Sequence, residues 1–161
     1  MKNRRRKPRK LDRTDRLILK YLQEDGRISN VALAKKVNLS ATPCHERVRR
    51  LERHGYIRGY TALLDPGMIK AGLLVFVEID LLRTSPDAFR DFRREATKLP
   101  ELLECHLVSG NFDYLLTASV MNKQEYRSLL GDKILALPGV SDSRSYVVME
   151  EVKETKVLPV I

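Results

Sequence analysis

Residues 27–55 read RISNVALAKKVNLSATPCHERVRRLERHG, and this stretch decides the fold of the first third of the chain. Apolar residues recur at helical spacing on both sides of the short polar segment Asn38–Ser40. Ser29 or Asn30 is expected to cap the first of these two helices, and Ser40 the second. So short a turn restricts the angle between neighbouring helices, which is typical of a helix-turn-helix.

The helix after Ser40 is predicted to have one apolar side and one basic side. Steps of 100° place Cys44, Val48 and Leu51 on a stripe that faces the core. In a helix-turn-helix, the first turns of this helix meet base edges in the major groove, and arginines reach guanine or phosphate. The alternative is a solvated arginine face on an ordinary surface helix. The candidate DNA-binding residues are Asn30, Ser40, Thr42, Pro43, His45, Glu46, Arg47, Arg49, Arg50 and Arg53.

Two more segments complete the predicted N-terminal domain. A helix capped by Asp12 is expected to run to about Asp25, and the residues of the middle helix expected to face inward are Val31, Leu33, Ala34 and Val37. Residues 56–64 (YIRGYTALL) predict a strand, or a pair of short ones, that forms a small wing. The turn Asp65-Pro66-Gly67 then marks the domain boundary.

Basic charge is concentrated at the N-terminal end of the chain. Residues 1–60 hold 18 Lys or Arg against 6 Asp or Glu, whereas residues 61–161 hold 12 against 15. Residues 1–10 carry seven Lys or Arg and no acid, which predicts a flexible basic tail that follows a phosphate backbone or only keeps the protein soluble. Such charge favours double-stranded DNA as the partner, because each neutralised phosphate releases counterions.

Composition argues against several other classes of protein. The chain has no secretory signal and no run of about 18 apolar residues, so we expect a protein that does not enter membranes. Cys44 and Cys105 lie in apolar patterns without metal-type spacing, which predicts buried thiols in a reducing, cytoplasmic setting. An enzyme on the C-terminal half is the competing hypothesis, since the ferredoxin-like fold also hosts catalysis. However, His45, His54 and His106 form no catalytic or metal-binding pattern, so no enzyme, cofactor or metal is predicted.

The periodicity changes near Leu73, where the second half of the chain begins. Strands are predicted at 73–82, 102–109, 112–121 and 142–152. One helix is expected to start at Ser85-Pro86, and another at a capping box made by Asn122 and Glu125. The resulting order, β-α-β-β-α-β, is that of a ferredoxin-like fold. The sheet face without helices, with Phe76, His106, Val108, Tyr146 and Val148, is apolar enough to predict a homodimer.

The fold class is therefore α+β: an N-terminal winged helix-turn-helix followed by a ferredoxin-like βαββαβ domain. The predicted boundaries are a basic flexible tail at 1–10, a DNA-binding domain at 11–64, a linker at 65–72, a ferredoxin-like effector-binding and oligomerisation domain at 73–153, and a C-terminal tail at 154–161.

Several segments resemble the leucine-responsive/asparagine-regulator (Lrp/AsnC) family of bacterial transcription factors. They are LDRTDRLIL, DGRISN, LSATPCHERVRRLERHGYIRGYTALL, LLVFVEI, ECHLVSGNFDYLL and LPGVSDSRSYVVMEEVK, within residues 11–153. The resemblance implies a nucleoid-associated regulator that activates or represses transcription and whose DNA binding responds to leucine or another small apolar amino acid. It also implies sheet-to-sheet dimers that assemble into octamers or larger species. An architectural DNA-binding protein with a vestigial ligand response is the alternative.

The resemblance also places an amino-acid effector site on the C-terminal half. The implied residues are Leu107, Ser109, Gly110, Asn111, Asp113, Tyr114, Met121, Tyr146 and Val148. Asp113 is expected to pair with the α-amino group of the effector. From spacing alone, Gly110 and Asp113 are also consistent with a hairpin glycine and a carboxylate that caps the turn.

Overall fold

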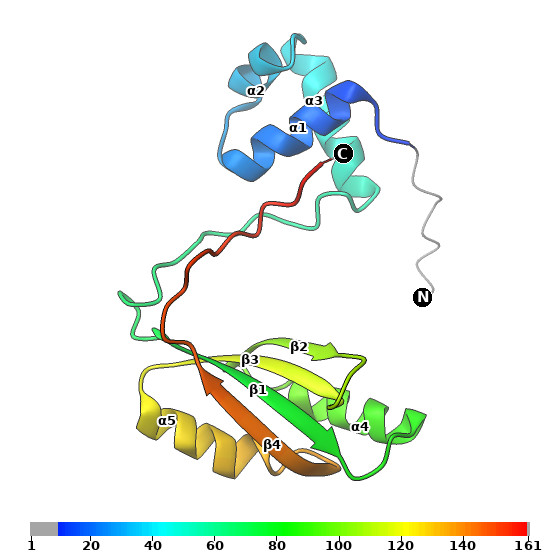
Figure 1. Ribbon diagram of the computed structural model, residues 1–161. Coiled ribbons are helices and arrows are strands. Elements are labelled where there is room, and N and C mark those ends of the chain that lie inside the picture. The colour runs from blue at the N-terminus through cyan, green and yellow to red at the C-terminus, as the bar shows by residue number, and fades with distance from the viewer. Residues whose placement is uncertain (1–9, 161) are drawn as a thin grey trace. The chain divides into compact units, whose positions relative to one another are not determined.

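Three helices near the N-terminus and a four-stranded sheet farther along the chain form two separate units (Figure 1). The structure is a computed structural model that describes residues 10–160. The helical unit extends to Leu63 and also includes residues 153–160, whereas the sheet unit is Leu64–Val152. The predicted basic tail therefore lies outside the described residues, except for Lys10.

The helical unit consists of α1 (Arg13–Glu24), α2 (Asn30–Lys36) and α3 (Ala41–Arg53). Its buried core is Ile18, Leu33, Ala34, Val37, Cys44 and Leu51, which confirms the predicted apolar stripes. The prediction for Val31 is wrong, because its side chain is 57% exposed. Steps of 100° place Val31 160° from Leu33, on the opposite side of α2.

The segment that leaves the helical unit contains no wing strand. Residues 54–72 form turns and irregular chain, so the strand predicted at 56–64 is wrong. A strand needs a neighbouring strand to pair with, and the structure provides none for these residues in its described part. Tyr60 anchors the segment instead: its hydroxyl donates to Glu52 Oε1 at 3.1 Å, and its ring lies against Gly26.

The C-terminal segment returns to the helical unit. The side-chain amide of Gln23 on α1 donates to the Leu158 carbonyl at 3.0 Å and accepts from the Leu158 N–H at 2.7 Å. This reciprocal pair resembles one rung of a β-ladder, and it joins the end of the chain to the first helix.

The sheet unit has the predicted β-α-β-β-α-β order. Its elements are β1 (Leu73–Leu81), α4 (Pro86–Ala96), β2 (Leu102–Leu107), β3 (Tyr114–Val120), α5 (Lys123–Ser128), the π-helix η1 (Leu129–Ile134) and β4 (Val140–Val147). The antiparallel strands lie in the order β2-β3-β1-β4, which is the ferredoxin-like topology. β4 ends earlier than predicted: its ladder with β1 stops at the pair Val75–Val147, with one further bond from the Val148 N–H to the Leu74 carbonyl.

Both helices of the sheet unit cover the same sheet face (Figure 1). The buried residues of β1 are the predicted ones: Val75, Val77, Ile79 and Leu81. The second helix does not stay α-helical to its end, which the sequence did not predict. In η1 the N–H of Leu135 bonds to the carbonyl of Leu130, five residues earlier, so Leu129 and Ile134 can both face the sheet.

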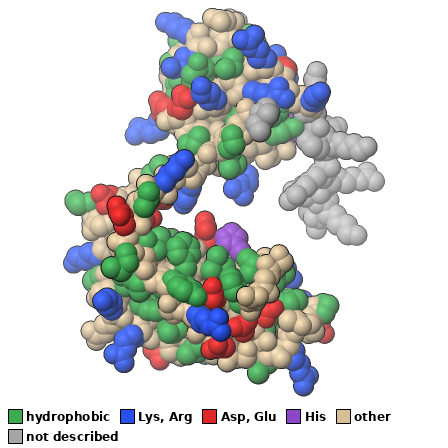
Figure 2. Space-filling view, in the orientation of Figure 1, with side chains coloured by type: hydrophobic (Ala, Val, Ile, Leu, Met, Phe, Trp, Pro, Cys, Tyr) green, Lys and Arg blue, Asp and Glu red, His purple; other side chains and the backbone are tan. Residues whose placement is uncertain are grey.

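The other face of the sheet is the open sheet face, which the strand register places on the uncharged residues Leu74, Phe76, Leu115, Thr117, Tyr146 and Val148 and on the ionisable residues Glu78, Glu104, His106 and Arg144. Phe76 on β1 stands between Thr117 and Tyr146 of the two neighbouring strands. The side chains of Phe76 and Tyr146 are 36% and 49% exposed. Hydrophobic side chains are prominent on the visible surface of the sheet unit, whereas several basic side chains stand out on that of the helical unit (Figure 2).

The two cysteines are free thiols in the two cores. Cys44 is fully buried, as predicted, whereas Cys105 is only partly buried. Burial raises the pKa of both thiols, which keeps them protonated and poorly reactive. In the part of the chain that the structure describes, no helix is long and apolar enough to cross a membrane.

Candidate nucleic-acid interface and effector site

The turn between α2 and α3 sets the direction of α3. Asn38 adopts a left-handed backbone conformation with φ of 54°, which asparagine tolerates better than most residues. The side-chain amide of Asn30 donates to the Ala41 carbonyl at 2.8 Å and so ties α2 to the first turn of α3. Asn30, a predicted DNA-binding residue, therefore holds the recognition helix within the protein.

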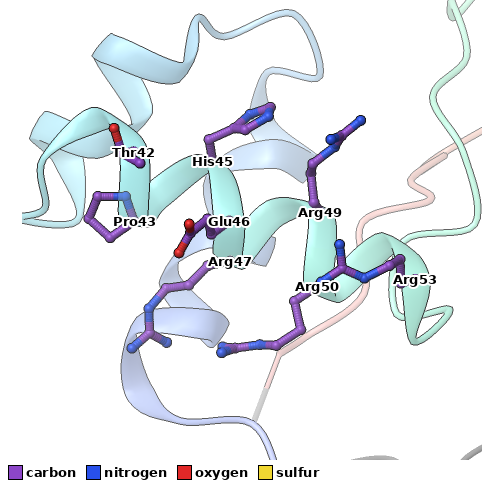
Figure 3. Close-up of a pocket in the computed structure, with 8 residues that line it drawn as sticks. All are labelled: Thr42, Pro43, His45, Glu46, Arg47, Arg49, Arg50 and Arg53. Carbon is purple, nitrogen blue, oxygen red and sulfur yellow. The ribbon is translucent and has the colours of Figure 1, made fainter.

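The outer side of α3 is an open hollow of about 640 Å³ (Figure 3). Eight of the ten predicted DNA-binding residues line it: Thr42, Pro43, His45, Glu46, Arg47, Arg49, Arg50 and Arg53. Four of these eight are arginines, so the hollow is a strongly basic surface. The structure therefore brings most of the predicted set together on one helix.

Two of the four arginines are free to contact a ligand. Arg49 and Arg53 lie opposite the buried stripe of α3, and both are exposed. Among residues 10–160 neither guanidinium has an ion-pair partner. Glu46 and Thr42 lie on the same outward stripe, about one and two turns before Arg49. This stripe combines donors and acceptors that match base edges and phosphates.

The other two arginines already have partners inside the protein. Arg47 Nη1 lies 2.6 Å from Asp12 Oδ2 and 2.8 Å from Asp15 Oδ1. Arg50 Nη2 lies 2.8 Å and 3.1 Å from the two oxygens of Asp15, whose side chain is only 7% exposed. In Figure 3 both guanidinium groups turn to the same side of α3, away from Arg49. The expectation that Arg47 and Arg50 point freely to DNA needs correction, because part of each guanidinium is bonded to α1.

Asp12 and Asp15 are site residues that the sequence reading missed. They also form a capping box on α1, in which Asp12 accepts from the Asp15 N–H at 2.8 Å. The bond from Arg47 is the main reason why the pKa of Asp12 is below its usual range. A signal was available, because two acids three residues apart on α1 match two arginines three residues apart on α3.

Ser40 differs from the other helix caps of this unit. Its side chain makes no capping hydrogen bond, whereas Ser29 accepts from the Ala32 N–H at 3.2 Å. The hydroxyl of Ser40 and the free N–H groups of the first turn of α3 are therefore available together. This is the usual arrangement at helix N-termini that bind phosphate.

Most of the predicted effector residues lie on two different parts of the sheet unit. Ser109, Gly110 and Asn111 form the exposed turn between β2 and β3, after Leu107. Met121 follows the opposite end of β3, and Val148 bonds to Leu74 near that end. Roughly 20 Å separates the two ends, since each strand residue rises about 3.3 Å. Within one chain the predicted set therefore does not converge on a single site.

Asp113 joins the turn to the neighbouring strand. Its Oδ2 accepts from the Leu81 N–H at 2.8 Å, and its own N–H donates to the Ile79 carbonyl. This is the capping role that the spacing allowed as an alternative. A carboxylate has acceptor sites to spare, so Asp113 can also bind an ammonium group.

Tyr114 needs a correction as an effector-binding side chain. It is 1% exposed and stacks on Phe92 with ring centroids 4.3 Å apart, on the helix-covered side of the sheet. Its hydroxyl donates to the Phe89 carbonyl at 3.3 Å. By contrast, Tyr146 lies on the open sheet face, where its hydroxyl donates to Glu78 Oε2 at 3.1 Å. Side chains alternate between the two faces of a sheet along each strand. Tyr114 pairs with the core residue Ile79 and therefore points to the helix-covered face.

Comparison with known proteins agrees with both units. Residues 11–58 match the family described as winged helix-turn-helix DNA-binding, and residues 74–158 match the Lrp/AsnC ligand binding domain. The leucine-responsive regulatory protein of Escherichia coli strain K12 is 63% identical over 145 residues, which cover 90% of this chain and 88% of that protein.

Two solved structures share the fold over nearly the whole chain. A transcriptional regulator from Neisseria meningitidis, in complex with L-Met, has a TM-score of 0.88 and 40% identity and covers 93% of this chain and 97% of its own. An AsnC family transcriptional regulator from Agrobacterium tumefaciens has a TM-score of 0.88 and 38% identity, with coverage of 92% and 97%.

Proposed function

The chain belongs to the Lrp/AsnC family of DNA-binding transcriptional regulators, and from that premise we propose that it reads specific DNA sequences with α3 under the control of a small amino acid. The observation that carries the proposal is the basic hollow on α3, where eight predicted DNA-binding residues gather. The effector is leucine or another small apolar amino acid, and the protein acts in the cytoplasm on the nucleoid.

The outward stripe of α3 supports this assignment to the DNA-reading surface. Arg49 and Arg53 are exposed and have no ion pair within the described chain, so their guanidinium groups can contact guanine or phosphate. Thr42 and Glu46 lie in the first turns, where recognition helices meet base edges. Ser40 adds a hydroxyl at the helix N-terminus for a backbone phosphate.

Replacing Arg49 or Arg53 with alanine is expected to weaken DNA binding. An arginine that reads a guanine is worth about 1–3 kcal/mol at one base pair, whereas one on a phosphate weakens all sequences equally and lowers the salt slope by about 1. The measurement is a titration of a duplex that the wild-type protein selects from a random-sequence pool, at several salt concentrations. Arg90→Ala in the sheet unit is the matched control, since Arg90 is also exposed and its one ion pair within the described chain is with Asp87. Wild-type affinity in both variants would refute this surface.

The effector site is proposed to need two protomers. The turn that holds Gly110 and Asp113 and the end that holds Met121 and Val148 lie at opposite ends of β3. A second copy can bring the missing end to each turn. The exposed apolar residues Phe76 and Tyr146 on the open sheet face support such a homodimer, which we propose assembles further to an octamer or a larger species.

Asp113→Asn is expected to weaken the amino-acid response without disturbing the fold. The new amide oxygen can still accept from the Leu81 N–H, but the negative charge that attracts an ammonium group is gone. A hydrogen bond to a charged group contributes about 1.5–3 kcal/mol, so the effective concentration of leucine should rise roughly tenfold or more. Sedimentation with L-leucine, L-methionine or L-alanine measures this, and Asp132→Asn on η1 is the control. An unchanged response would refute the role of Asp113.

A further inference from the structure

We infer that Asp12, the N-cap of α1, and Asp15 in its first turn are positioning residues for DNA recognition, which hold Arg47 and Arg50 in place and limit their binding to unrelated DNA. The inference rests on the proposed function, since it requires α3 to be the DNA-binding helix. Asp15 is central because both arginines donate to its Oδ1: Arg47 Nη1 and Arg50 Nη2 each lie 2.8 Å from this oxygen.

The distances show that these arginines are fixed before DNA arrives. Bonds of 2.6–2.8 Å between a guanidinium and a carboxylate are charge-assisted and strong. Arg47 and Arg50 are also well covered, at 27% and 30% exposure of the side chain. A long side chain that is already ordered loses less conformational entropy when it binds a ligand.

Charge gives the acids a second role. A free arginine binds any phosphate within reach, which strengthens binding to every sequence alike. The two carboxylates offset the charge of two of the four arginines on α3. Each held guanidinium still has N–H donors to spare, out of five, but can offer them only from one position. Correctly placed phosphates should thus be accepted, while displaced ones are not.

The four arginines of α3 are placed for two different kinds of DNA contact. Arg49 and Arg53 are exposed and lie opposite the buried stripe of α3, whereas Arg47 and Arg50 lie on the side that meets α1 and turn away from Arg49 (Figure 3). In a helix-turn-helix the recognition helix enters the major groove, and its outward side meets base edges. Arg49 and Arg53 are therefore placed for bases, whereas Arg47 and Arg50 lie at the margin of that side, where backbone phosphates are closer.

Asp15→Asn tests the inference in the full-length protein. We expect the variant to bind a scrambled duplex more tightly, by roughly eightfold for each released arginine in 0.1 M salt, because each added phosphate contact contributes a slope of about 0.9. The salt slope should become steeper, and the ratio of affinities for the selected and scrambled duplexes should fall. Asp12→Asn is the second variant, since its carboxylate is half exposed and its loss disturbs the core less.

Glu24→Gln on the same helix is the matched control, because it also removes one negative charge, and Glu24 pairs with Lys20 of its own helix and not with an arginine of α3 among the described residues. Circular dichroism gives the folded fraction by which each affinity is normalised. A purely structural role predicts weaker binding to both duplexes in proportion to the unfolded fraction, and that result would overturn the inference. An equal increase in the affinity of Glu24→Gln for the scrambled duplex would also overturn the inference. Unchanged binding in Arg49→Ala and Arg53→Ala would instead refute the proposed DNA-binding surface.

Discussion

Replacing Ile18 with alanine is expected to abolish DNA binding while the sheet unit stays folded. Ile18 is fully buried on α1, in a core that also contains Leu33, Cys44 and Leu51. Truncation of a buried isoleucine to alanine costs about 2–5 kcal/mol, which is a large part of the stability of so small a unit. Hydrogen exchange should show lost protection in α1–α3 and normal protection in β1–β4.

Leu116→Ala is the mirror experiment for Ile18→Ala. Leu116 is fully buried in the core of the sheet unit, which shares no residue with the core of the helical unit. We expect this variant to lose protection in the strands while the helices remain protected. Loss of protection in both units from either substitution would show that the chain folds as one cooperative body, contrary to the two separate cores.

Phe76→Asp is expected to separate the proposed dimer into folded monomers. Phe76 is at the centre of the open sheet face, next to Thr117 and Tyr146, and its side chain is partly exposed in one chain. A single chain can therefore keep the new carboxylate in water. A dimer that covers this face would bury an unpaired charge, at a cost of several kcal/mol or on the order of 100-fold or more in the dissociation constant.

Sedimentation of the wild-type protein and the variants measures that loss. Leu135→Asp is the control, since Leu135 is an apolar residue with 46% exposure on the helix-covered side of the sheet unit. It should leave the assembly unchanged. Dimers that persist in Phe76→Asp at the wild-type dissociation constant would place the interface elsewhere. A monomeric variant should also respond less to leucine, because the proposed effector site needs two protomers.

Local pattern predicted most of the surface that we propose reads DNA. The 100° step between helical residues decides which side of α3 is apolar, and that side is buried at Cys44 and Leu51, as predicted. The same step does not show which residues of other helices contact a side chain at the edge of the apolar side. Arg47 is such a residue, and its partners Asp12 and Asp15 are on another helix. Asp12 was correctly predicted as a cap, but its second role needed the packed structure.

For the effector residues too, the sequence indicated the set of residues, but the packed structure decided where each of them lies. Family resemblance implied one site, but the strand order places Gly110 and Met121 at opposite ends of β3. It also places Tyr114 in the core and Tyr146 on the open sheet face. Which face a strand residue occupies depends on its register with its neighbours, and a shift of one residue exchanges the faces.

By itself, the sequence determined the order of helices and strands, the buried stripes and the basic face of α3. These follow from repeats of 3.6 and 2 residues, which depend only on neighbours along the chain. Only the tertiary structure decided that Asp15 holds Arg47 and Arg50, 32 and 35 residues away, and that Tyr60 anchors residues 56–64 in place of a wing strand. Such contacts depend on the angles and offsets at which distant elements pack, which no local repeat specifies.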